Sequence, residues 1–234
     1  MKMKNKKQEQ LLARRKHKDT LKNKRRKEPE LTRGVPKLVE KPLILIVCEG
    51  ENTEPSYFNQ FKLTTATVKS FGEGYNTISL VDRAIELNRG KKYNEVWCVF
   101  DKDDFKDSNF NNAIQKATAN KFKVGYSIQS FEYWLILHFD DHQGGSMHRS
   151  LYNYRINELI RPFKIEYDGE GSKIVSEKFF ALLNGIDSKT KEIRVKTAIK
   201  RAKRNYNNFD HKNISKEESS TTVFKLVEKL LKYT

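Results

Sequence analysis

Residues 43–50 read LILIVCEG, an apolar run that ends in a carboxylate, and residues 95–104 read EVWCVFDKDD, which repeats that plan further along the chain. Short apolar runs rich in β-branched side chains are typical of strands buried in a parallel sheet. In open α/β sheets, ligands bind in the crevice beyond the carboxyl ends of the strands. The two acidic clusters are therefore expected to meet at one edge of a sheet.

Glu49, Asp101 and Asp103 are the predicted ligands of a divalent cation. Alternate residues of a strand face the same side, so Asp101 and Asp103 should point into the crevice while Lys102 points away. Converging carboxylates repel one another unless a cation holds them, and Mg²⁺, or Mn²⁺ in its place, suits such hard oxygen ligands. The metal would stabilise charge on a phosphate and lower the pKa of a bound water. The alternative is that these acids are solvated loop residues or helix caps.

Glu132 is a further candidate, because it follows a fourth predicted strand and begins a helix. It would emerge from the same edge of the sheet as the other acids, where it could serve as a metal ligand or a general base. A carboxylate in the first turn of a helix can equally do no more than complement the helix dipole. Both readings stay open at this point.

Strands and helices alternate around these runs. Strands are predicted at residues 43–47, 65–70, 95–100 and 123–128, and helices at residues 54–62, 76–88, 110–120 and 131–139. This order implies right-handed crossovers and a parallel sheet with helices on both faces. Beyond about residue 145 the strand signals fade, and helices are predicted at residues 149–160, 174–183, 191–207 and 221–232. The chain is therefore an α/β protein with a basic tail (1–37), an α/β core (38–145) and a helical extension (146–234).

Basic charge is concentrated in two places. The net charge is +16, and residues 1–33 hold 14 Lys or Arg against 4 Asp or Glu, so that this tail alone carries +10. Such a tail is expected to be disordered or a solvated helix. The predicted helix at 191–207 carries a second basic face, with Lys196, Lys200, Arg201, Lys203 and Arg204. Excess basic charge favours a nucleic-acid partner, DNA or RNA; the alternative is a solubilising, solvated surface.

The remaining composition excludes several classes of protein. The only cysteines, Cys48 and Cys98, lie in apolar runs rather than at zinc-ligand spacing. The N-terminus lacks the apolar segment of a signal peptide, and no run is long enough to span a membrane. A reduced, cytoplasmic setting is expected. The chain also has no P-loop, so any ATPase that works with it must be a separate protein.

Five short motifs in order resemble the RloB family. They are IVCEGENTE at 46–54, FDKDD at 100–104, SFEYWL at 130–135, AIKRAK at 198–203 and SSTTV at 219–223. The resemblance implies the Toprim-like, Rossmannoid fold of topoisomerases, primases and OLD-type nucleases. It also implies a prokaryotic antiphage-defence role beside restriction or ATPase genes. By this resemblance, Glu49 is the Toprim glutamate, Asp101 and Asp103 its metal-binding pair, and Glu132 the acid after the fourth strand. Glu54 and Asp104 are weaker candidates.

The sequence therefore predicts a Mg²⁺-dependent nuclease. Water would hydrolyse a phosphodiester of DNA or RNA, tRNA included, with Glu49, Asp101, Asp103 and Glu132 as the catalytic groups and the basic helix on the substrate phosphates. The alternative function is a catalytically weak module that binds nucleic acid or docks on a separate ATPase.

Overall fold

The computed structural model describes residues 2–26, 41–70, 77–90, 93–103 and 106–234. The chain divides into two units, residues 1–40 and residues 41–234. In the first unit a single helix, α1 (Lys2–Arg26), takes one of the two forms that the sequence left open for the tail. Its described side chains, at residues 8–23, are exposed to solvent. The expected domain start near residue 38 lies outside the described residues.

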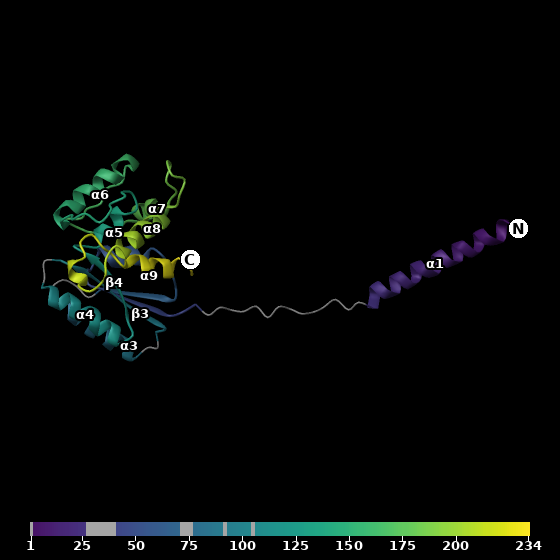
Figure 1. Ribbon diagram of the computed structural model, residues 1–234, viewed down its shortest axis with the longest axis horizontal. Coiled ribbons are helices and arrows are strands. Elements are labelled where there is room, and N and C mark those ends of the chain that lie inside the picture. The colour runs from purple at the N-terminus through teal and green to yellow at the C-terminus, as the bar shows by residue number, and fades with distance from the viewer. Residues whose placement is uncertain (1, 27–40, 71–76, 91–92, 104–105) are drawn as a thin grey trace. The chain divides into compact units, whose positions relative to one another are not determined.

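The second unit is built on a parallel sheet of four strands. They are β1 (Ile44–Cys48), β2 (Ala66–Ser70), β3 (Glu95–Lys102) and β4 (Lys123–Ile128). The strand order is β2-β1-β3-β4, and every neighbouring pair is parallel. The predicted α/β class and parallel sheet are therefore confirmed (Figure 1).

Helices cover both faces of this sheet, as predicted. Helices α3 (Thr77–Arg89) and α4 (Asp107–Ala119) pack on the face that holds Leu45 and Val47 of β1. Ile44, Ile46 and Cys48 point to the opposite face, because neighbouring side chains of a strand alternate. A strand buried on both sides needs an apolar residue at every position, which explains the unbroken run at 44–48.

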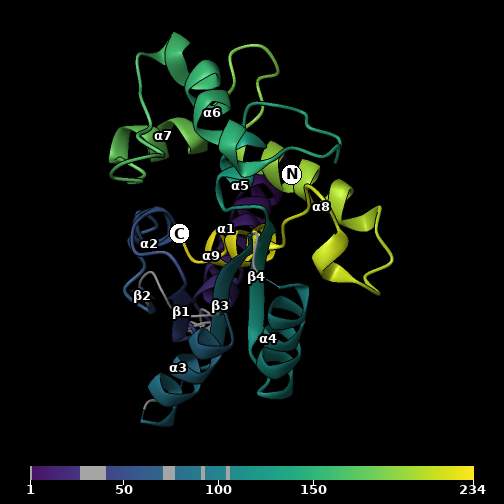
Figure 2. The ribbon, with the colours of Figure 1, turned by 90° about the vertical axis from the view of Figure 1, so that its left-hand side faces the viewer.

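The opposite face is covered by the other helices described in the second unit. These are α2 (Thr53–Asn59), α5 (Glu132–Ile136), α6 (Tyr152–Ile160), α7 (Glu177–Asn184), α8 (Arg194–Asn207) and α9 (Val223–Leu230), with 3-10 turns η1 (Arg149–Leu151) and η2 (Arg161–Phe163). A third 3-10 turn, η3 (Ile214–Lys216), packs instead on the side of α4. Figure 2 shows α5 and α6 at the end of the sheet where β4 leads into α5. None of the helices described has the length and apolar character needed to cross a bilayer.

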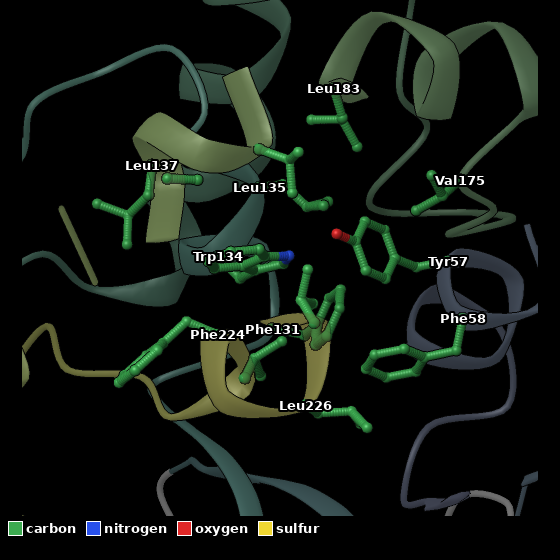
Figure 3. Packing of buried hydrophobic residues seen from close by; sticks show 14 of the residues in the cluster. Tyr57, Phe58, Phe131, Trp134, Leu135, Leu137, Val175, Leu183, Phe224 and Leu226 are labelled. Carbon is green, nitrogen blue, oxygen red and sulfur yellow. The ribbon is translucent and has the colours of Figure 1, made fainter. Parts of the chain in front are cut away.

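Aromatic side chains fill the core between these helices and the sheet. The ring of Tyr57 lies 5.5 Å from that of Phe131, and Phe58 lies 5.8 Å from Phe131, both in edge-to-face geometry. Trp134 of α5 is fully buried, and in Figure 3 it points toward Tyr57 of α2. This core fixes α5, and with it the segment that carries Glu132, against the sheet.

Residues 219–222 pair with the outer side of β4. The backbone N–H of Ile128 donates to Ser220 O (2.8 Å), and that of Thr222 donates to Tyr126 O (2.8 Å). An antiparallel bridge joins Ser127 to Thr221. The helix predicted from residue 221 therefore begins only at Val223, because the two threonines first serve as a strand-like edge.

Candidate functional site

The two acidic clusters meet at the carboxyl edge of the sheet. Parallel pairing of β1 with β3 places Cys48 opposite Val99, and the N–H of Glu49 donates to Val99 O (2.9 Å). One residue further on, the backbone N–H of Asp101 donates to Glu49 Oε2 (3.2 Å). Glu49 and Asp101 are thus neighbours, and the predicted convergence is confirmed for this pair.

Asp101 is also tied to the segment after β4. Its Oδ2 accepts a hydrogen bond from the N–H of Phe131 (3.0 Å). Its Oδ1 is buried and has no hydrogen-bond partner among the residues described. An unpaired carboxylate oxygen in a buried site is costly, and a bound cation is one way to compensate it.

Hydroxyl groups from three separate segments hold Glu132. Ser130 Oγ donates to Glu132 Oε2 (2.5 Å), and Tyr167 OH donates to Glu132 Oε1 (2.7 Å). Thr53 Oγ1 donates more weakly to the same Oε1 (3.4 Å). Glu132 therefore does more than begin α5: its carboxylate is fixed beside the acidic cluster, where its charge acts on Asp101 and Glu54.

Glu54 belongs to the cluster more firmly than the sequence suggested. It lies in the first turn of α2 and is only 5% exposed. A Cβ added to Gly50 would overlap the Glu54 carboxylate, so the glycine of the Glu-Gly pair makes room for it. The sequence offered no sign of this approach, because it joins a loop to the helix that follows.

Burial and mutual repulsion raise the pKa values of these acids. Burial is the main cause for Glu49, whose pKa rises to about 7, and the charge of Asp103 adds to it. The pKa of Glu54 also rises to about 7, through burial and then the charges of Glu132 and Glu49. Burial, followed by Glu54, Glu132 and Glu49, raises the pKa of Asp101 well above its usual value. The cluster thus carries more negative charge than its surroundings compensate.

Arg149 is the basic residue that the structure adds to this site. Its Nη1 lies 3.8 Å from Asp103 Oδ2, and its charge lowers the pKa of Glu49, against the larger effect of burial. Lys102, between the two aspartates, reaches Asp107 of α4 (3.3 Å). The sequence gave no reason to choose Arg149, since it lies in a 3-10 turn far along the chain.

The side-chain oxygens of the cluster are not gathered about one point. Within the described ranges, no three His, Cys, Asp or Glu side chains are arranged to hold a single metal ion. The reason is visible in the hydrogen bonds: Glu49 and Asp101 turn oxygens toward backbone N–H groups, and Glu132 toward hydroxyl groups. Asp104, the weaker candidate, lies outside the described residues.

The basic face of α8 is only partly available to a ligand. Lys196 and Lys203 are exposed, and Lys200 pairs with Glu192 (2.7 Å). Arg204 Nη2 donates to Asp141 Oδ1 (2.8 Å), while Arg201 Nη1 donates to Leu137 O (2.8 Å). The two arginines fasten α8 to the end of α5 and to the loop that follows it, so they would have to leave these partners to contact a phosphate.

Arg201→Gln is expected to lower the free energy of unfolding by about 1–3 kcal/mol, since it leaves the carbonyl of Leu137 without its donor. The Arg201 side chain is only 18% exposed, and its Nε also lies 3.6 Å from Asp141 Oδ1. Lys203→Gln on the exposed side of the same helix is the control, with an expected change within about 0.5 kcal/mol. Urea denaturation measures both variants. If the two are equally stable, the hydrogen bond from Arg201 to Leu137 O does not contribute to stability.

The fold and the acidic cluster together define an α/β protein with a doubly covered parallel sheet and converging carboxylates at its carboxyl edge. The family model described as RloB-like protein matches residues 44–230, which is most of the chain. The chain therefore belongs to the RloB-like family. Comparisons with curated proteins and with solved structures found no match.

Proposed function

We propose that this protein is a metal-dependent nuclease that hydrolyses phosphodiesters of DNA or RNA. The observation that carries the proposal is the convergence of Glu49, Asp101 and Glu132 at the carboxyl edge of the sheet. The negative charges of these acids repel one another, and Asp101 Oδ1 is buried without a hydrogen-bond partner among the residues described. Such a site is suited to a cation that brings a phosphate to carboxylates.

The donor set fits Mg²⁺ or Mn²⁺ in chemistry, because every candidate ligand is a carboxylate oxygen. Glu49, Asp101 and Asp103 would hold the metal, with Glu54 close by. When bound, the metal would stabilise charge on the phosphate and lower the pKa of a water. Glu132, fixed by Ser130 and Tyr167, would orient the attacking water and accept its proton.

A water nucleophile is preferred to a covalent one. The hydroxyl of Tyr167 touches Glu132, but the residue is 1% exposed and cannot reach a polynucleotide backbone. Cys48 and Cys98 are both buried in strands, and burial raises their pKa values. The Toprim relationship, a role in antiphage defence and a separate ATPase partner are part of the same proposal, and they rest on the resemblance of the motifs.

The test is a cleavage assay with the full chain. Single-stranded and duplex DNA, mRNA and tRNA are each incubated with Mg²⁺, with Mn²⁺ or with EDTA. Cleavage that requires the metal supports the nuclease. Binding without cleavage under every condition supports instead the alternative of a docking module that works with a separate ATPase.

Metal-free protein is expected to lose stability as the pH rises from about 5 to about 8. The folded-state pKa values of Glu49 and Glu54, about 7, lie above their ordinary value of 4.5, so the folded state binds these protons more tightly than the unfolded state. Their contribution to stability is complete below the ordinary value and is lost as the pH rises through about 7. Mg²⁺ should reverse the loss, so its effect on the melting temperature should be larger at pH ~8 than at pH ~5.5.

Thermal melts in EDTA and in Mg²⁺ at the two pH values measure this difference. In Glu49→Gln/Glu54→Gln protein the pH dependence should become weaker, since two of the three acids with raised pKa values are gone. If Mg²⁺ raises the melting temperature equally at both pH values, the metal does not bind at the acidic cluster.

A further inference from the structure

A pocket of about 290 Å³ opens beside the acidic cluster, with Glu132 of the cluster in its lining. Ser130 and Glu132 line the side toward the cluster. Arg149 and Asn153, from η1 and α6, also line the pocket, and so does Lys173 on the loop that follows Tyr167. Its walls thus come from segments far apart in the sequence, and one of them carries a proposed catalytic residue.

The loop that carries Lys173 is fastened in place by hydrogen bonds. Asn153 Oδ1 accepts from the N–H of Gly169 (3.1 Å), and Asn157 Nδ2 donates to Tyr167 O (2.7 Å). A Cβ on Gly169 would crowd Asn153 Oδ1 and the ring of Tyr167, so glycine permits this close approach. The hydroxyl of Tyr167 in turn holds Glu132, which ties the pocket wall to the acidic cluster.

Hydrogen bonds to Asp168 stabilise the turn before Lys173. Asp168 Oδ1 accepts from the N–H of Gly171 (2.8 Å), and its Oδ2 accepts from that of Ser172 (2.7 Å). The N–H of Lys173 then donates to Asp168 O (2.8 Å). These hydrogen bonds therefore fix the backbone of the loop at Lys173.

Two cations and two carboxylates line the pocket. Arg149 also reaches the cluster, since its Nη1 is 3.8 Å from Asp103 Oδ2, and Lys173 is the second cation of the lining. Glu132 faces the cluster, and Glu170 is exposed and can turn toward solvent. Cationic side chains together with amide and hydroxyl donors are suited to a phosphate oxyanion.

The size of the pocket restricts what can enter it. About 290 Å³ lies at the lower end of small-ligand sites. Such a volume accommodates a single nucleotide unit, whereas a base-paired nucleotide would first have to leave its stack. An unpaired strand meets no such cost.

We propose that this pocket binds one phosphate-bearing nucleotide of an unpaired strand, with Arg149 and Lys173 on its phosphate, next to the carboxylates that act on the neighbouring phosphodiester. The inference rests on the proposed function, to which it adds a substrate class. Single-stranded segments are preferred over duplex, and Arg149 and Lys173 are positioning residues for the strand.

Another pocket provides a matched control. It has a volume of about 370 Å³ and is lined by Arg161 and Lys164. Arg161 lies in a 3-10 turn as Arg149 does, and Lys164 shares with Lys173 a left-handed backbone conformation, with φ of 56° and 53°. Arg161→Gln/Lys164→Gln therefore removes equal charge from equivalent backbone positions, at a pocket whose lining includes none of the cluster acids.

The experiment measures the affinity of the full chain for a fluorescent 12-nucleotide single strand, as DNA and as RNA, and for the matching duplex, in EDTA at several salt concentrations. Arg149→Gln/Lys173→Gln is expected to bind the single strand at least about 10-fold more weakly. Its salt dependence should be shallower by about 0.7 in log K against log salt, the value for one phosphate of a single strand that is no longer neutralised. Arg161→Gln/Lys164→Gln should bind within about 2-fold of wild type.

Two further variants extend the test. The Glu170→Gln variant should bind the single strand more tightly, because it removes a negative charge from the rim of the pocket. If the Arg149→Gln/Lys173→Gln variant does not fold, Lys173→Gln alone takes its place and should show part of the loss in affinity. Wild-type affinity in the Arg149→Gln/Lys173→Gln variant, equal loss in the control, or preference of the wild type for duplex would each overturn the proposal. Because the assay contains no metal, it is independent of cleavage: intact binding without hydrolysis would fault only the proposed nuclease chemistry.

Discussion

Asp101→Asn is expected to reduce phosphodiester hydrolysis by at least about 10²–10³-fold, the loss seen when one group that supports transition-state charge is removed. Asp101 is the residue that joins the two halves of the site. It donates its N–H to Glu49, accepts from Phe131, and keeps one carboxylate oxygen buried without a partner among the described residues. An amide in its place keeps the size of the side chain and removes the negative charge that a cation requires.

The same substitution should leave the fold intact or strengthen it. The amide oxygen can still accept the hydrogen bond from the N–H of Phe131. The charge that is lost faces Glu54, Glu132 and Glu49, whose repulsion raises the pKa of Asp101 beyond the effect of burial alone. The expected signature is thus low activity with an unchanged or higher melting temperature in EDTA, which separates a functional defect from unfolding.

Asp82→Asn is the matched control for this experiment. Asp82 lies on α3 and pairs on the surface with Lys116 (2.7 Å), away from the acidic cluster. The variant should retain wild-type cleavage rates, since exposed ion pairs contribute little. Full activity of the Asp101→Asn variant would end the proposal that this carboxylate holds a catalytic metal.

Trp134→Ala should have the largest effect on stability, a loss of about 3–5 kcal/mol in the free energy of unfolding. The indole is fully buried, and its ring lies 4.8 Å from that of His138 in edge-to-face geometry. In Figure 3 it points into the space that α2 and α9 share with α5. A cavity there cannot close easily, because strand and helix side chains surround it. For a domain whose total stability is about 5–15 kcal/mol, this loss can be decisive.

Tyr154→Ala removes an aromatic side chain that is 67% exposed, and its stability should change by less than about 0.5 kcal/mol. Equilibrium denaturation in urea measures both variants. If the Trp134→Ala variant unfolds at the same urea concentration as wild type, the helical face of the sheet does not depend on this side chain.

Much of the fold could be predicted from the sequence, because the buried strands leave a direct record in it. Residues 44–48 are apolar at each position since both faces of β1 are covered, and the same holds for most of β3. Helix ends were less predictable. Thr221 is compatible with helix by its local sequence, yet its Oγ1 donates to Tyr126 O (2.9 Å), and this long-range contact delays the helix to Val223.

The site was predictable where it depends on strand topology. Glu49 and Asp101 meet because parallel neighbours end at one edge, which the two apolar runs already imply. Tyr167 could not be found in the same way: its hydroxyl reaches Glu132 only because Asn157 fixes the loop, and no local pattern encodes that contact. On α8, the periodicity of the sequence identified a basic face, but it could not reveal that Arg204 donates a hydrogen bond to Asp141.

The strand-like edge at residues 219–222 has a consequence for biosynthesis. Until these residues leave the ribosome, β4 presents an unsatisfied row of backbone groups to the crowded cell, and such rows invite pairing with other chains. The nascent protein can assemble β1 to β4 and still lack this seal. A chain truncated before residue 219 would leave this edge of β4 open, and such a product is expected to aggregate more readily than the full chain.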